Sequence, residues 1–194
     1  MPRFLFWQKK KMEIRPIAGF LSAAECALLI HLAERKSMVE STVLLEKAED
    51  RSDNRRSRTA WLTPADHPFL GVLSERARAT TGIDPQWFED LQVVRYEPGG
   101  YFRPHYDQCS EGSEACSAET RRFGGRKRRY TLLVYLNDGY GGGETRFPRL
   151  KRSFRSATGD ALLFSSAHED ALHEGAPVTR GVKWICNLWM RPPP

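Results

Sequence analysis

The sequence has few cysteines and lacks both a tight cysteine and histidine cluster and a long apolar run. A structural zinc site usually needs four such ligands, so none is indicated. The N-terminal segment 1–11 has four consecutive apolar residues, too few for a signal-peptide core or a membrane span. We therefore expect a soluble cytoplasmic protein with reduced cysteines. Cys109 and Cys116 are close enough in the sequence for a disulfide across a loop, which remains an alternative for this pair.

Internal repeats and low-complexity tracts are absent as well. With 194 residues, 40% of them hydrophobic and 28% charged, the chain has the composition of an ordinary globular protein. This length suits one core better than two. We expect a single domain over 1–194, with a helical N-terminal support over about 1–85 and a β-rich core over about 86–190.

The predicted elements change in kind along the chain. Ser22 and Glu25 form a capping box before a helix over 23–35, and a second helix is expected from about 66 to 80. The polar segment 46–58 predicts a loop. From Leu91 onward, short apolar runs alternate with glycine-containing turns, which is typical of a sandwich or a barrel.

One run, 130–136, predicts a strand that is buried on both sides. Alternation puts Thr131, Leu133 and Tyr135 on one face and three aliphatic residues on the other. An apolar face that also carries hydroxyl groups suits the wall of a barrel that holds a small polar ligand.

Candidate metal ligands lie in the segment His105-Tyr106-Asp107. Residues two apart on a strand project from the same face, so His105 and Asp107 can reach one ion. His173, followed ten residues later by Lys183, is the candidate third ligand. Two histidines and one carboxylate leave coordination positions open, as in the non-haem Fe(II) oxygenases.

Positive charge is concentrated in one stretch. The net charge is +6, and six of the lysine and arginine residues fall within 121–129. Such a run could attract an acidic partner or a nucleic-acid backbone, or it could be a solvated loop.

Six ordered blocks resemble the Fe(II)- and 2-oxoglutarate-dependent dioxygenases of the prolyl 4-hydroxylase type. They are 57–62, 95–107, 129–137, 142–148, 159–164 and 173–189. The resemblance implies a mainly β (α+β) fold, in which N-terminal helices flank a double-stranded β-helix, or jelly-roll, core.

The resemblance also implies roles for individual residues. His105, Asp107 and His173 would hold Fe(II), and no catalytic side chain beyond this metal centre is implied. The co-substrate 2-oxoglutarate would be bound by Lys183, Tyr135, Tyr96 and Thr131. A buried lysine in an apolar strand does require an anionic partner.

Substrate contacts follow from the same similarity. Trp189 matches an aromatic residue that lines the substrate site, and Arg122 or Arg121 falls near an arginine that contacts peptides. Arg58 and Phe102 complete the candidate set. Phe102 is a departure, because prolyl hydroxylases often have a tyrosine at this position, and this weakens the transfer of substrate contacts.

The implied activity is hydroxylation of an unactivated C–H bond with O₂, giving succinate and CO₂, with ascorbate as reductant. Prolyl 4-hydroxylation of a peptide or protein is the first choice. The alternatives are hydroxylation of a free amino acid or small molecule, nucleic-acid demethylation and a non-catalytic binding module.

Demethylases usually anchor the co-substrate with an arginine, whereas this chain has Lys183, so a nucleic-acid partner is not favoured. A membrane partner is not expected, and the sequence does not indicate the oligomeric state.

Overall fold

The structure is a computed structural model that describes residue 12 and the segments 14–44 and 49–193. The N-terminal segment 1–11, from which we expected neither a signal peptide nor a membrane span, lies outside the described residues. In the described part of the chain, no helix has the length and apolar character that a bilayer crossing requires.

The larger of two facing sheets has seven antiparallel strands. Their spatial order is β1 (Ile14–Ile17), β13 (Ala161–Ser165), β9 (Tyr130–Tyr135), β16 (Lys183–Met190), β7 (Leu91–Tyr96), β6 (Arg58–Leu62) and β2 (Val39–Glu40). Three of these strands precede residue 85, so the N-terminal segment contributes to the sheet as well as supporting it with helices.

The smaller sheet has five strands and faces the first. Its order is β12 (Arg152–Phe154), β11 (Thr145–Phe147), β14 (His173–Gly175), β8 (Tyr101–His105) and β5 (Arg55–Arg56). Two short pairs complete the strands: β10 (Gly141–Gly142) with β15 (Val178–Arg180), and β3 (Val43–Leu44) with β4 (Glu49–Asp50). Three single-turn 3₁₀ helices are η1 (Pro85–Trp87), η2 (Pro148–Leu150) and η3 (Glu169–Ala171). The mainly β jelly-roll fold is confirmed, but the loop expected over 46–58 contains strands β4 and β5 in its described part.

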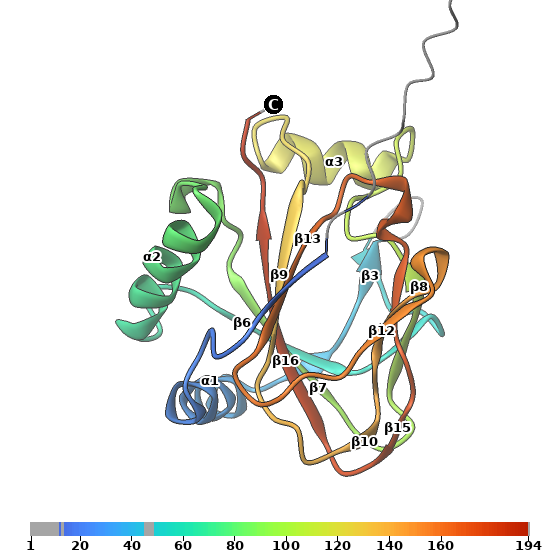
Figure 1. Ribbon diagram of the computed structural model, residues 1–194. Helices are drawn as coiled ribbons and strands as arrows, with labels where there is room; N and C mark the ends of the chain where they lie inside the picture. The colour runs from blue at the N-terminus through green and yellow to red at the C-terminus, as the bar shows by residue number, and fades with distance from the viewer. Residues whose placement is uncertain (1–11, 13, 45–48, 194) are drawn as a thin grey trace, which may run out of the picture.

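Two helices, α1 (Ala23–Arg35) and α2 (Phe69–Thr81), lie on one side of the larger sheet (Figure 1). The capping box at the start of α1 is present, with Ser22 and Glu25 bonding reciprocally. Buried residues of both helices share one apolar cluster with the outer face of the sheet, which includes Leu132, Val134 and Cys186. A second cluster, between the two sheets, includes Leu133 and Tyr135. The alternation predicted for 130–136 therefore separates the helix-covered face from the interior.

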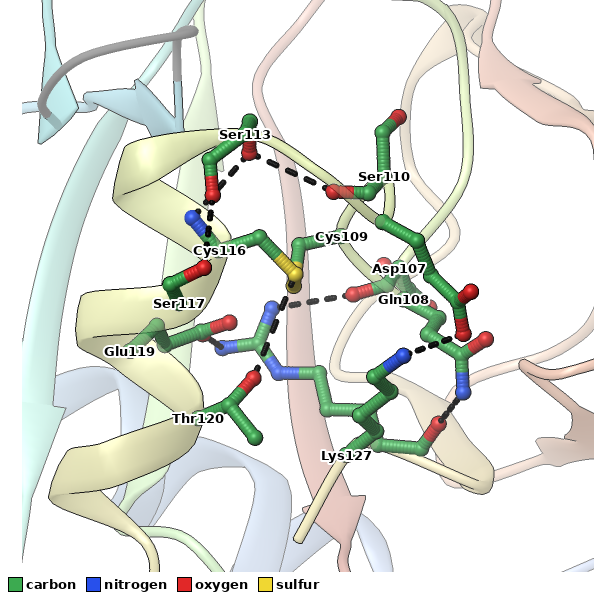
Figure 2. Close-up of a disulfide and its surroundings, with 12 residues drawn as sticks. Asp107, Gln108, Cys109, Ser110, Ser113, Cys116, Ser117, Glu119, Thr120 and Lys127 are labelled. Carbon is green, nitrogen blue, oxygen red and sulfur yellow. Dashed lines mark hydrogen bonds and ion pairs between the residues drawn. A yellow bond between two sulfur atoms is a disulfide. The ribbon is translucent and has the colours of Figure 1, made fainter. Parts of the chain in front are cut away.

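A third helix, α3 (Glu114–Arg122), was not among the predicted elements, and its last two residues begin the basic run 121–129. It is short and polar, and its N-cap Ser113 accepts a hydrogen bond from the amide of Cys116. Cys109 and Cys116 form a disulfide, with their Cα atoms 5.4 Å apart. The expectation that all cysteines are free thiols is therefore wrong for this pair, while Cys26 and Cys186 are free and buried. Figure 2 shows the bridge joining the first turn of α3 to the segment just after Asp107.

Glycine substitutions at two positions should have opposite effects on stability. Gly159 has φ +87°, and a Cβ there would lie 1.9 Å from the carbonyl oxygen of Leu21, whereas a Cβ at Gly71 in α2 meets nothing within 4 Å. We expect Gly159→Ala to lower the free energy of unfolding by about 3 kcal/mol. Gly71→Ala should raise it by about 1 kcal/mol through helix propensity. Urea denaturation followed by circular dichroism measures both, and equal midpoints would contradict this account.

The disulfide should be detectable by counting thiols. Denatured protein alkylated without reductant should gain two adducts of its four cysteines, and all four after reduction. The double substitution Cys109→Ser with Cys116→Ser should lower the free energy of unfolding by about 2 kcal/mol, because a short loop of the unfolded chain is no longer closed. Reductant should destabilise the parent protein by a similar amount and leave the double variant unchanged.

Candidate metal and co-substrate site

Three potential metal ligands converge between the two sheets. His105 ends β8, Asp107 follows two residues later, and His173 begins β14 directly opposite His105. One potential ligand atom from each residue lies within 4.8 Å of the others. Nε2 of His105 is 3.8 Å from Oδ1 of Asp107, and Nε2 of His173 is 3.7 Å from Oδ2. The strand pairing thus assembles the three residues that the sequence analysis selected.

Backbone carbonyls orient both imidazole rings. Nδ1 of His105 lies 2.8 Å from the carbonyl oxygen of Arg103, and Nδ1 of His173 lies 2.9 Å from that of Ala171. A carbonyl can only accept, so each Nδ1 carries a proton, and each Nε2 is the ring nitrogen that remains to bind a metal. Burial, together with the neighbouring His173, lowers the pKa of His105 to about 3. His105 is therefore neutral at physiological pH, as a metal ligand must be.

Asp107 is ionised in this setting. Burial acts to raise the pKa of its carboxyl group, but the two histidines and a hydrogen bond from Thr131 outweigh burial and hold the pKa below its usual value. Two imidazoles and one carboxylate are the donor set of the non-haem Fe(II) facial triad. The residues present therefore fit an iron ion chemically.

Lys183 lies at the inner end of the same pocket. It begins β16 opposite Tyr96, is 2% exposed, and donates to the carbonyl oxygen of Gly143 at 2.6 Å. Its Nζ lies 5.4 to 5.9 Å from the ring centres of Tyr96, Tyr135 and Tyr140. Burial lowers the pKa of Lys183 to about 8. A cation so enclosed is suited to an anionic ligand such as a carboxylate.

Tyr135, Thr145 and Thr131 carry buried hydroxyl groups near this site, and of these three residues only Thr145 lines the pocket. The Tyr135 hydroxyl donates to Oγ1 of Thr145 at 2.9 Å, and burial raises the pKa of Tyr135. The Thr131 hydroxyl, in contrast, donates to Asp107 at 2.6 Å. The three potential ligands and Lys183 line one pocket, together with Gln92, Tyr96, Phe102, Leu133, Thr145, Glu174, Gly175, Ile185, Asn187 and Trp189.

Only some of the candidate substrate residues reach this pocket. Phe102 stacks on His105 with ring centres 3.4 Å apart, and Trp189 lines the wall. Arg58 and Arg122 are not among the lining residues. The Arg58 guanidinium donates to the carbonyl oxygen of Met38, and Arg122 is exposed at the end of α3.

A buried ion cluster, made of Glu89, Glu119, Arg128 and Arg191, stands beside Trp189. Arg128 makes two bonds to Glu89, at 2.7 and 2.8 Å, and its guanidinium lies 3.6 Å above the Trp189 ring. Arg191 bonds Glu89 at 2.6 Å and Glu119 at 2.8 Å. Despite burial, the two arginines hold the pKa of Glu89 below its usual value. The cluster has no sequence signature, because its members are far apart in the chain and no local pattern links them.

The same contacts change the interpretation of the basic run 121–129. Arg128 is internally paired, and Lys127 is paired with Glu111. Arg126 stacks over the ring of Trp87 at 4.2 Å. Much of the positive charge in this run is therefore committed to intramolecular contacts and is less available to a nucleic-acid backbone than the sequence suggested.

Gln92 and Asn187 also line the pocket but were not selected from the sequence. They are register partners on β7 and β16, and their side chains hydrogen bond at 3.2 Å. Their inward direction follows from the same alternation that points Lys183 inward. This alternation is the sequence signal from which Gln92 and Asn187 could have been predicted to line the pocket.

Comparisons with known proteins agree with this geometry. Residues 91–191 match the family model described as the 2OG-Fe(II) oxygenase superfamily. The chain is 39% identical, over 71% of its length, to a protein of Acanthamoeba polyphaga mimivirus named "Putative prolyl 4-hydroxylase". It is 31% identical, over 94% of its length, to prolyl 4-hydroxylase subunit alpha-3 of Rattus norvegicus. These matches span 58% and 35% of the two relatives' own lengths.

Solved structures show the same fold. A viral collagen prolyl hydroxylase of Paramecium bursaria Chlorella virus 1, in complex with 2OG, superposes with a TM-score of 0.71 at 31% identity, covering 93% of this chain and 96% of that one. A Pseudomonas putida prolyl-4-hydroxylase has a TM-score of 0.65 at 18% identity, over 95% of each chain, which supports the fold alone. With the family match covering the strands that carry all three potential ligands and Lys183, the chain belongs to the 2OG-Fe(II) oxygenase superfamily.

Proposed function

We propose that this protein is an Fe(II)- and 2-oxoglutarate-dependent dioxygenase that hydroxylates proline residues in a peptide or protein. The whole chain, 1–194, would act as one catalytic domain. The observation that carries the proposal is the single pocket that contains both the His105, Asp107 and His173 group and the buried Lys183. The prolyl 4-hydroxylase names of its relatives support the reaction type.

His105, Asp107 and His173 would hold the iron ion. When bound, iron with O₂ and 2-oxoglutarate supplies the oxidising power to hydroxylate an unactivated C–H bond, giving succinate and CO₂, with ascorbate as the reductant that maintains the metal. The side chains themselves need not act as general acid or base. Their task is to bind, orient and exclude water.

Lys183 would bind the carboxylate of 2-oxoglutarate that lies farther from the metal. The buried ammonium group provides the charge, and the Thr145 hydroxyl, which accepts from Tyr135, provides a nearby hydrogen-bond donor. Tyr96 would enclose the co-substrate from the β7 side. These groups orient the co-substrate so that its keto-acid end faces the metal ligands.

The substrate would enter past Phe102 and Trp189. Both are flat apolar rings at the pocket wall, and such surfaces suit a proline ring better than a charged side chain. Arg122, exposed on α3, would meet only a peptide that extends beyond the pocket. Arg58, bonded to the Met38 carbonyl, lies farther along the larger sheet.

Activity should depend on the proposed metal ligands. Purified protein supplied with Fe(II), ascorbate and 2-oxoglutarate should form succinate faster when a proline-rich peptide is added, and mass spectrometry should find one extra oxygen atom in the peptide. His173→Ala should reduce succinate formation by at least about a thousandfold, because two remaining ligands do not hold iron in the required geometry.

Exposed His31 in α1 supplies a matched control, and His31→Ala should retain full turnover. Normal turnover in His173→Ala would contradict the assignment of the site. If succinate forms and a free amino acid is hydroxylated while no peptide gains oxygen, the substrate belongs to the small-molecule class instead.

Binding of 2-oxoglutarate should weaken at alkaline pH. Lys183, with its pKa lowered to about 8 by burial, is protonated below that value and becomes neutral above it. An anion binds the charged form, so the dissociation constant should increase by up to about tenfold for each pH unit above about 8. Isothermal titration of the Mn(II)-loaded protein measures this dependence. Lys183→Met should bind weakly with no such dependence, and a constant affinity of the parent protein up to about pH 10 would contradict the role of Lys183.

A further inference from the structure

Two buried hydroxyl groups stand behind Asp107. Oγ1 of Thr131, on β9, lies 2.6 Å from Oδ2 of Asp107, and Oγ of Ser166 lies 2.6 Å from the same Thr131 oxygen. Thr131 is 1% exposed and Ser166 is 2% exposed. Water does not reach these two hydroxyl groups, so Ser166, Thr131 and Asp107 must supply one another's hydrogen bonds.

The direction of the protons follows from the chemistry of the groups. An ionised carboxylate only accepts, so the Thr131 hydroxyl must donate to Asp107. A hydroxyl has a single proton, and Thr131 therefore accepts from Ser166. The order is Ser166 to Thr131 to Asp107, in which each bond polarises and strengthens the next.

The backbone fixes where both hydroxyls lie. Thr131 is held between β13 and β16, opposite Phe164 on one side and Trp189 on the other. Ser166 follows the end of β13, and its amide donates to the carbonyl oxygen of Arg129 at 2.9 Å. Asp107, in contrast, lies beyond the end of β8 and has no register partner of its own. The rigid sheet therefore supplies the orientation that the ligand's own segment lacks.

We propose that Thr131 and Ser166 are positioning residues that hold the carboxylate of Asp107, through Oδ2, in the orientation in which it would bind the metal. The proposal rests on the proposed function of this site as an iron centre. It gives Thr131 a role different from the co-substrate contact that the family resemblance implied. Its consequence is that the orientation of Asp107, and with it the affinity for the metal, depends on two residues outside the set of potential metal ligands.

Metal affinity, measured without co-substrate, tests the proposal separately from turnover. Thr131→Val keeps the shape of the side chain but removes the donor, so Oδ2 is left buried without this partner. Anaerobic titration of the apoprotein with Fe(II) should show an affinity about 10 to 100 times weaker than that of the parent. Thr131→Ser restores the hydroxyl and should recover most of the affinity. Ser166→Ala removes only the supporting bond and should cost about fivefold.

Ser165→Ala is the matched control, because Ser165 neighbours Ser166 but the Thr131 hydroxyl bonds Ser166. It should bind Fe(II) as the parent does. Equal Fe(II) affinity of Thr131→Val and the parent would overturn the positioning role. If Thr131→Val does not fold, as judged by circular dichroism, then Ser166→Ala decides, and unchanged affinity there also overturns it. Failure of the parent protein to bind Fe(II) would instead remove the proposed function.

Discussion

The antiparallel pairing of β16 with both β7 and β9 is the constraint on which the rest of the molecule depends. It sets Lys183 opposite Tyr96, Ile185 opposite Tyr135, and Trp189 opposite Thr131. Side chains alternate along a strand, so the odd-numbered residues of β16 face the pocket. Its even-numbered residues Trp184, Cys186, Leu188 and Met190 join the apolar cluster under the helices. A shift of the β16 register by one residue would turn the pocket-facing residues toward the helices and the core residues toward the pocket, and would destroy both.

The two faces of the larger sheet also differ in what they contribute to stability. The outer face, covered by α1 and α2, is almost wholly apolar and supplies the burial that drives folding. The inner face contains a buried lysine and several hydroxyls, and the smaller sheet adds the two potential metal-binding histidines opposite it; all of these groups cost free energy unless they are hydrogen bonded. Backbone carbonyls of Arg103, Ala171 and Gly143 accept from His105, His173 and Lys183, so much of this compensation comes from the main chain.

Elements with a local signature were predictable from the sequence. The capping box predicted the start of α1, and the alternation in 130–136 predicted the two faces of β9. The spacing around His105 and His173 identified the potential metal ligands. Helix α3 was missed because it is short and polar, although Ser113 before Glu114 is a recognisable start signal. Partners of Arg128 and Thr131 were not predictable, because such contacts depend on how distant strands are brought together.

The buried ion cluster beside Trp189 has a consequence for the order in which the molecule assembles. Glu89 precedes β7, Glu119 belongs to α3, Arg128 precedes β9 and Arg191 follows the last strand, β16. Glu89 and Arg191 are 102 residues apart. An incomplete cluster leaves a buried charge uncompensated, so it gains stability only after the final strand has been inserted. We expect the entrance to the pocket to form late in folding and to open early in partial unfolding, while the helix-covered face is still intact.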